Sequence, residues 1–441
     1  MIAALRRTTE LGLVVLAALI TVGLYVLASL GTTASIPANV VPFLGMILGL
    51  FGLAHVATRK LAPSADGTLL PLAGLLNGLG YVFIARLDTH LAGLQATWTA
   101  IGIAAYILTL VFVRRTRDLE SYRYTFMLIG LGLLLLPLVP GVGRNINGAR
   151  IWVSLGPLNF QPGEFAKIVL AVFFASYLVE KREILRIAAH RIGPISLPDL
   201  KHFGPVILAW GASLVVMIAE RDLGSSLLFF ALFLAMLWIA TERLSYLAIG
   251  FVLFAVGAVT ATFAFSHVQS RIDIWIDPWS HAATAGYQVV QSQFAMAWGG
   301  ITGTGPGLGN PGIIPAAESD FIFAAIAEEL GLLGATAVLI TFLLMVGAGL
   351  RIAIRSGAPF DKLLATGLTA IIGVQSFIII GGVVRLVPLT GVTLPFVSYG
   401  GSSLVANYVL LALLMRISAA DETAPMAGDP TSVAPGGRSR S

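Results

Sequence analysis

Apolar segments of about 20 residues recur along almost the whole chain, separated by short polar stretches. The hydrocarbon core of a bilayer is about 30 Å thick, and a helix needs about 20 mostly apolar residues to cross it. Hydrophobic residues make up 57% of the chain and charged residues 11%, against roughly a quarter charged in a soluble domain. The sequence therefore predicts an all-α polytopic membrane protein.

We expect about twelve transmembrane helices, each near the length that spans a bilayer. The first follows Arg6 and Arg7 and is too long for the core of a signal peptide, so we expect it to remain as an anchor. The expected positions are 11–31, 38–57, 68–86, 96–113, 124–140, 164–180, 205–219, 225–241, 245–265, 321–350, 362–385 and 393–417.

Composition excludes several classes of function. The chain has no cysteine and therefore no disulfide, cysteine nucleophile or cysteine metal site. Its six histidines are scattered without metal-ligand spacing. The net charge of +5 does not indicate nucleic-acid binding, because no basic face is interleaved with aromatic residues.

The distribution of Lys and Arg predicts the orientation, because cytoplasmic loops carry an excess of both. With a cytoplasmic N-terminus, the basic clusters at 59–60, 114–123 and 181–201 all fall on the cytoplasmic side. The opposite segments 32–37 and 386–392 contain no Lys or Arg. An even number of spans then places both termini in the cytoplasm.

This orientation puts two long polar segments outside, at 141–163 and 266–320. We expect the second to be a structured extracellular loop before the tenth helix, because its tryptophans are typical of interfacial anchors. Within it, residues 287–297 are amphipathic and predict a short interfacial helix. Residues 419–441 are rich in Ala, Pro, Gly and Ser and predict a disordered cytoplasmic tail.

Asp320 stands where the 266–320 loop turns into the next predicted helix. Its side chain, or that of Ser319, could accept a hydrogen bond from the backbone as an N-cap. Alternatively, Asp320 is a general base or a ligand contact at the outer membrane face. An apolar rim there would raise the pKa of its carboxyl group, which suits proton abstraction.

Glu328 and Glu329 follow inside the same predicted helix, roughly 13 Å below its start. An unpaired carboxylate within a bilayer costs several kcal/mol. At least one of them is therefore expected to face the bundle interior. It would form either a polar lock between helices or part of a proton path or polar cavity.

Glu164 and Lys167 follow Pro162 at a predicted helix start, where Glu is favoured near the positive end of the helix dipole. The two side chains are three residues apart and share a helix face. They could form a local ion pair. Alternatively, Lys167 faces a cavity and binds an anionic group such as a phosphate.

Other polar positions also lie on the predicted outer side. Arg150 and Arg385 are candidate phosphate contacts or snorkelling interfacial arginines. Asp222 is predicted to cap the helix that follows it. The glycine-rich run 299–310 lacks the Lys-Ser/Thr ending of a P-loop, and we interpret it as a hinge-rich loop.

Five groups of motifs follow one another in order along the chain. They are Asn147–Trp152 with Gln161–Lys167, Asp222–Ser225, Trp275–Ser292, Pro315–Gly331 and Pro388–Ser403. Together they resemble the SEDS family (shape, elongation, division and sporulation), which includes RodA and FtsW. The resemblance covers residues 65–418.

The resemblance implies a peptidoglycan glycosyltransferase that polymerises lipid II at the outer face of the bacterial cytoplasmic membrane. Asp320 matches the family's key aspartate and would deprotonate the GlcNAc 4-hydroxyl. Lys167 and Arg150 would stabilise pyrophosphate, and Glu164 would orient Lys167. Undecaprenyl pyrophosphate would leave, with inversion at the sugar carbon.

The resemblance also implies further contacts. Gln288, Gln291 and Ser398 lie in matching motifs and are candidate substrate-binding residues. No metal site formed by protein side chains is expected, although the resemblance allows a divalent cation, Mg or Mn. The implied partner is a class B penicillin-binding protein, a transpeptidase.

Family members commonly have fewer helices, so residues 1–60 are expected to form two additional spans ahead of a core at 61–418. This longer arrangement resembles RodA-like members from actinobacteria and predicts a role in elongation and cell shape. Two other functions remain open. One is a lipid II flippase whose essential charges would be Glu328 and Glu329, and the other is a non-catalytic scaffold for cell-wall synthases.

Overall fold

The computed structural model describes residues 2–421, except 39, 147–148, 156–157, 187, 193–194, 199–210, 213–214, 217–218 and 221. The tail predicted at 419–441 therefore falls largely outside the described residues, and its first three residues belong to the last helix. In chain order the elements are α1 (Ile2–Thr33), α2 (Val40–Leu61), α3 (Leu69–Leu87), α4 (Thr89–Phe112), α5 (Arg117–Glu120), α6 (Arg123–Leu135), η1 (Leu136–Leu138), β1 (Gly143–Ile146), β2 (Ala149–Leu155), β3 (Leu158–Phe160), α7 (Pro162–Arg186), β4 (Ala188–Ile192), β5 (Ile195–Pro198), α9 (Leu223–Thr241), α10 (Leu244–Ala264), α11 (Ser266–Ile276), η3 (Trp279–His281), α12 (Tyr287–Gly299), η4 (Pro311–Ile313), α13 (Ile322–Arg355), α14 (Pro359–Val383) and α15 (Gly401–Asp421).

The predicted class, a helical polytopic membrane protein, is confirmed. Within the described part of the chain, 10 helices are long and apolar enough to cross a membrane. The predicted span at 124–140 corresponds to a shorter apolar helix, Arg123–Leu138. The predicted span at 205–219 lies largely outside the described residues, so the total of twelve remains a prediction.

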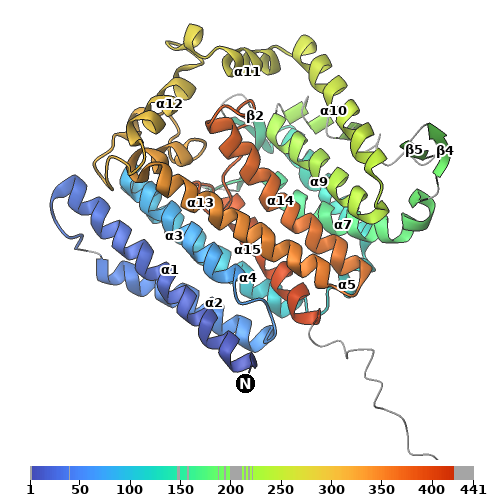
Figure 1. Ribbon diagram of the computed structural model, residues 1–441, viewed down its shortest axis with the longest axis horizontal. Helices are drawn as coiled ribbons and strands as arrows, with labels where there is room; N and C mark the ends of the chain where they lie inside the picture. Colours follow the sequence, from blue (N-terminus) through green and yellow to red (C-terminus); the bar gives the residue numbers. More distant parts are fainter. Residues whose placement is uncertain are drawn as a thin grey trace, which may run out of the picture.

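The bundle has a buried centre and a lipid-facing edge. Buried residues fill 78% of the membrane-length window in α14 and in α15, but 17% of that window in α10. α15 packs on α4, and α14 packs on α7, α9 and α13. The N-terminal pair α1 and α2 lies along one edge beside α3 (Figure 1). These two additional helices are thus packed directly against the core.

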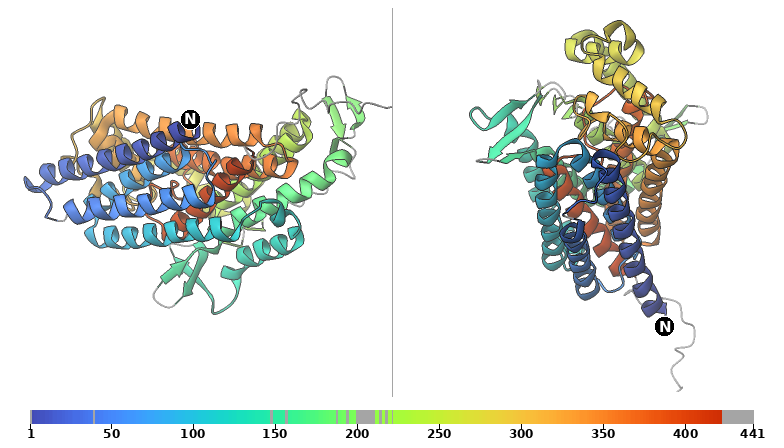
Figure 2. Two further views of the ribbon diagram at one scale, coloured as in Figure 1. Left: turned by 90° about the horizontal axis from the view of Figure 1, so that it is seen from below. Right: turned by 90° about the vertical axis from the view of Figure 1, so that its left-hand side faces the viewer.

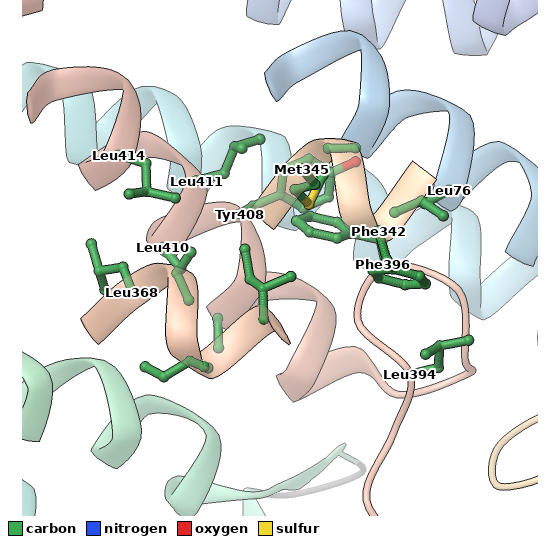
Figure 3. Close-up of a cluster of buried hydrophobic side chains, with 14 of the residues drawn as sticks. Leu76, Phe342, Met345, Leu368, Leu394, Phe396, Tyr408, Leu410, Leu411 and Leu414 are labelled. Carbon is green, nitrogen blue, oxygen red and sulfur yellow. The ribbon is translucent and has the colours of Figure 1, made fainter. Parts of the chain in front are cut away.

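A hydrophobic cluster joins α3, α13, α14 and α15 and is closed by the turn at 393–397 (Figure 3). Phe396 of this turn meets Tyr408 of α15 edge to face, with ring centroids 5.4 Å apart. We expected the last span to begin at residue 393, but α15 begins at Gly401. Pro395 disfavours helix at the residue before it, and Phe396 has a φ of +64°.

The 266–320 segment is structured, as predicted. It contains α11 and α12, which lie over the end of the bundle opposite the N-terminus (Figure 2). α12 confirms the short helix expected at 287–297.

Two small antiparallel sheets were not predicted. The strands β1, β2 and β3 form one in the 141–163 segment, and β4 pairs with β5 in the other. The first projects from the side of the bundle (Figure 2). Strand pairing satisfies the backbone N–H and C=O groups of a long connection that has too few apolar residues to form a core.

Candidate active site

A cavity of about 400 Å³ lies beside Asp320, at the end of the bundle that α11 and α12 cover. Its walls come from segments far apart in the sequence. α11 contributes Arg271 and Trp275, α12 contributes Gln288, and the connection after α14 contributes Arg385. The cavity therefore forms only when the long outer loop docks on the ends of α13 and α14.

Asp320 belongs to a turn and not to the cap of α13. The backbone N–H groups of Asp320 and Phe321 donate to the Ala316 carbonyl oxygen at 3.1 and 3.3 Å. α13 begins at Ile322 with Phe321 in the N-cap position and no side-chain cap hydrogen bond. The N-cap explanation for Asp320 or Ser319 is therefore wrong. The Asp320 carboxylate lines the cavity instead.

The open space in front of Asp320 is kept by Gly391. A Cβ placed on Gly391 would lie 3.9 Å from Asp320 Oδ2 and 3.8 Å from Arg271 Nη2. Gly391 also has a φ of +78°, which favours glycine. The carboxylate and the guanidinium thus face one small region that no side chain fills.

Burial in this cavity raises the pKa of Asp320 to about 6. The nearby Arg271 charge lowers the pKa of the same carboxyl group, and the Glu318 charge raises it, but burial has the largest effect. A carboxyl group with a pKa near the working pH is well suited to take up and release a proton.

Two arginines give the cavity its positive charge. Arg271 Nη1 donates to the Leu389 carbonyl oxygen at 2.7 Å. Arg385 Nη2 donates to the carbonyl oxygens of Trp275 and Ile276 at 3.0 and 3.1 Å, and Trp275 Nε1 donates back to the Arg385 carbonyl oxygen at 3.0 Å. Backbone carbonyls therefore fix both guanidinium groups, and other N–H donors on each can bind an anion.

Arg385 was a candidate from the sequence, whereas Arg271 was missed. A signal for Arg271 was available. The positive-inside rule makes arginine unusual in an outer segment, and Arg271 lies in the predicted outer loop. An arginine in an outer segment is not explained by the positive-inside rule and is therefore a candidate for binding an anion.

Lys167 and Glu164 lie inside the bundle, away from the cavity wall. Their predicted ion pair is confirmed, with Lys167 Nζ 2.5 Å from Glu164 Oε2. Lys167 Nζ also donates to Gln375 Oε1 at 2.7 Å, and Gln375 Nε2 donates to the Thr393 carbonyl oxygen at 2.8 Å. The pair thus connects α7 to α14 and to the turn that precedes α15.

An electrostatic link joins this pair to the cavity through Asp222. Asp222 caps α9 as predicted, accepting from the Ser225 N–H at 3.0 Å. Burial raises the pKa of Asp222, and the Arg271 charge lowers it while the Glu164 charge raises it. Arg271 therefore acts on both Asp222 and Asp320.

The other candidate residues take different positions. Gln288 lines the cavity and donates weakly to the Pro315 carbonyl oxygen at 3.4 Å. Gln291 is half-buried one turn along α12 and is not among the residues that line the cavity. Arg150 lies half-buried in β2 and is likewise not part of the cavity wall. Of the three, the structure brings only Gln288 to Asp320.

Ser398 supports the turn that carries Asp320. Its hydroxyl donates to the Ser319 carbonyl oxygen at 2.6 Å and accepts from the Leu394 N–H at 2.9 Å. The Tyr399 N–H donates to the Glu318 carbonyl oxygen at 2.8 Å, beside this bridge. The contacts place Ser398 behind Asp320 as a brace between two turns.

We expect Ser398→Ala to lower the free energy of unfolding by about 1–3 kcal/mol, because it leaves the buried Leu394 N–H and the half-buried Ser319 carbonyl unpaired. Ser176→Ala is the matched control, since the buried Ser176 hydroxyl has no hydrogen-bond partner among the described residues. Unfolding of the purified variants in detergent measures the difference. Equal stability of the two variants would contradict the bracing role of Ser398.

Glu328 and Glu329 bind the glycine-rich loop. Glu328 Oε1 accepts from the Asn310 N–H at 2.7 Å, and Glu329 Oε2 accepts from the Gly307 N–H at 2.8 Å. Arg86 Nε lies 3.4 Å from Glu329 Oε1. The predicted polar lock is confirmed, but it joins α13 to the glycine-rich loop as well as to α3.

The helix that carries these glutamates is not continuous, as its prediction had assumed, because α13 is broken at Gly331. Gly331 has φ +66° and ψ −167°, and a Cβ there would lie 2.2 Å from Gly303 N. Residues 332–355 are long enough to span about 30 Å by themselves. The two carboxylates therefore lie beside the end of α3 and not midway down a continuous helix.

The cavity does not provide a cation cage. Within the described residues, no group of three or more His, Asp or Glu side chains could hold a metal ion. Asp320 is the single carboxylate among the described residues of the cavity wall, and two arginines share that wall. Magnesium often binds one or two carboxylates together with substrate phosphates, and Asp320 could supply only one such ligand.

The fold and the cavity together define a class, a polytopic helical membrane protein with a carboxylate and two arginines in a cavity at one end of the bundle. The family model for cell cycle proteins of the FtsW/RodA/SpoVE type matches residues 73–423. The chain belongs to this family, the SEDS family that its motifs indicated.

Relatives and solved structures agree with that membership. The peptidoglycan glycosyltransferases RodA of Mycobacterium tuberculosis and Mycobacterium leprae are each 44% identical to this chain, over 94% of it and 90% of their own length. A chain of a peptidoglycan synthase complex superposes with a TM-score of 0.68 at 28% identity, covering 82% of this chain and 99% of that one. Thermus thermophilus RodA gives 0.58 at 26% identity, covering 80% and 97%.

Proposed function

We propose that this chain is a peptidoglycan glycosyltransferase that polymerises lipid II into glycan strands for cell elongation and shape. One observation carries the proposal, namely that Asp320 shares a cavity with Arg271 and Arg385. Glycosyl transfer from a lipid pyrophosphate needs a base for the acceptor hydroxyl and positive charge for the leaving group. The mycobacterial relatives named peptidoglycan glycosyltransferase support the same reaction.

In the proposed reaction, Asp320 accepts the proton of the GlcNAc 4-hydroxyl of one lipid II. The hydroxyl oxygen forms a bond to the anomeric carbon of the second substrate, whose bond to pyrophosphate breaks. Undecaprenyl pyrophosphate leaves with the electron pair, and the anomeric carbon is inverted to give a β linkage. Arg271 and Arg385 stabilise the charge that develops on the pyrophosphate.

The geometry of the cavity changes which residues we propose as pyrophosphate contacts. The sequence assigned them to Lys167 and Arg150, whereas the cavity offers Arg271 and Arg385. We propose that Lys167 and Glu164 position the surrounding turns instead. A divalent cation, Mg or Mn, would come bound to the substrate phosphates with Asp320 as one ligand, and no step above depends on it.

The proposed setting is the bacterial cytoplasmic membrane, with both termini in the cytoplasm and the cavity at the outer face. The distribution of Lys and Arg supports this orientation. A class B penicillin-binding protein is the proposed partner. The similar chain from a complex that coordinates polymerization and crosslinking supports such an assembly.

Reconstitution in liposomes tests the function. We expect the purified protein, with its transpeptidase partner, to convert lipid II into glycan polymer that is visible on a gel. The same vesicles report flipping through the exposure of labelled lipid II on the other leaflet. Transbilayer movement without polymer would overturn the glycosyltransferase proposal and favour the flippase.

A further inference from the structure

A second groove lies at the opposite end of the bundle from the Asp320 cavity. It has a volume of about 390 Å³ and runs between α1, α3 and α13. The wall is apolar over about two helical turns of α1 and of α13 and about one turn of α3. It includes Leu16 and Ile20 of α1, Leu72 and Leu75 of α3, and Leu343 and Leu344 of α13.

The position of the groove requires a hydrocarbon occupant. All three helices are long and apolar enough to span the membrane. The side chains of Leu16, Leu343 and Leu344 are 51%, 69% and 57% exposed on the surface of the bundle, so the groove opens toward lipid. An apolar space of this kind does not hold ordered water, which needs several polar partners.

The shape favours an acyl chain over a helix of another protein. A helix about 10–12 Å across would fill a volume of this size with roughly one turn. The groove instead extends along about two turns of α1 and of α13, from Leu13 to Ile20 and from Leu343 to Arg351, and along about one turn of α3. A narrower, chain-like occupant therefore fits it.

The groove ends at a basic group. Arg351 lines it and is 45% exposed at the side chain. Arg351 Nη2 donates to Asp66 Oδ2 at 2.7 Å and to Thr68 Oγ1 at 3.4 Å, and both contacts use the same nitrogen of a group with five N–H donors. Arg355 lies one turn further along α13, is exposed, and shares this face.

We propose that this groove binds a diacyl phospholipid with an anionic headgroup. One acyl chain lies along the leucine wall, and the phosphodiester sits on Arg351 with Arg355 nearby. Basic pockets between transmembrane helices on the cytoplasmic side commonly bind anionic headgroups, and the proposed orientation places the groove on that side. The lipid would join the additional helix α1 to α13, whose other end follows the turn that holds Asp320.

Gly347 allows a direct test of the acyl-chain contact. It lines the groove, and a Cβ on it would have no atom within 4 Å, so Gly347→Leu places the start of a bulky side chain at the groove wall without a backbone clash. Gly45→Leu on α2 is the matched control, because a Cβ there is equally free and Gly45 does not line the groove. Both changes replace a helical glycine with a better helix former.

Native mass spectrometry of the delipidated protein with added phosphatidylglycerol measures binding without any assay of polymerisation. We expect bound phosphatidylglycerol on the wild type and on Gly45→Leu, and at least a tenfold weaker apparent affinity for Gly347→Leu. Equal binding by both glycine variants would overturn the proposal, because the lipid would then lie elsewhere.

The headgroup contact needs its own comparison. We expect the wild type and Arg351→Lys to prefer phosphatidylglycerol over phosphatidylcholine, and Arg351→Gln to lose most of that preference. Asp66 keeps its hydrogen bond from the Thr68 N–H at 2.9 Å in these variants. An unchanged preference in Arg351→Gln would show that Arg351 does not bind the phosphate and would overturn this part of the proposal.

Discussion

Asp320→Asn is expected to lower the rate of lipid II polymerisation by at least about 100-fold, because a positioned general base contributes about 10²–10⁴-fold. The change keeps the size of the side chain and removes only its capacity to accept the proton. The turn around Asp320 is held by backbone bonds to Ala316 and by the Ser398 brace, so the fold should be retained. A gel-based polymerisation assay with equal amounts of folded protein measures the rate.

The pH profile of the wild-type polymerisation rate should show the ionisation of the same carboxyl group. A base acts in its ionised form, and the pKa of Asp320 is raised to about 6 by burial. The rate should therefore fall as pH drops through about 6, approaching a tenfold loss per pH unit below it, and should level off above pH 7. The residual rate of Asp320→Asn should lack this step.

Asp273→Asn provides the control, because Asp273 is an exposed carboxylate on α11 that does not line the cavity. It should keep nearly the wild-type rate and the wild-type pH profile. A wild-type rate in Asp320→Asn would show that the catalytic base lies elsewhere. If the pH profile of the wild type has no step near pH 6, Asp320 does not accept the proton, even if the residue proves essential.

The sequence predicted those features that depend on local composition. Apolar runs of bilayer length identified the spans because a helix in lipid satisfies its backbone within the run itself. The cap of α9 by Asp222 and the pair of Glu164 with Lys167 were predictable for a similar reason, since the partners in each contact are three positions apart in the sequence.

Features that depend on contacts between distant segments were missed. Gly331 looks like any helical glycine in the sequence, and the break in α13 exists because the loop around Gly303 docks there. Arg271 becomes a site residue only because Leu389, more than a hundred positions later, accepts its hydrogen bond. The N-cap prediction for Asp320 failed because the N–H groups of Asp320 and Phe321 donate to Ala316 in a turn. The helix therefore begins only after this turn, at Ile322.

The second large effect is expected at Lys167. Lys167 is 1% exposed and Glu164 is 7% exposed, so removal of one partner leaves the other charge buried without compensation. Breaking such a pair typically costs about 3–5 kcal/mol. We expect Lys167→Met to lower the free energy of unfolding in detergent by that amount and to abolish polymerisation, because the uncompensated Glu164 charge disrupts the packing around Gln375 and the turn at Thr393.

The double variant Lys167→Met with Glu164→Gln separates a structural role from a chemical one. Neutralising Glu164 removes the buried charge, so much of the stability should return, as it does when buried pairs are replaced by uncharged residues. Since Lys167 does not line the Asp320 cavity, polymerisation should return together with the stability. A double variant that is stable yet inactive would mean that Lys167 reaches the pyrophosphate during the reaction, and Arg271 and Arg385 would then not be its sole cationic contacts.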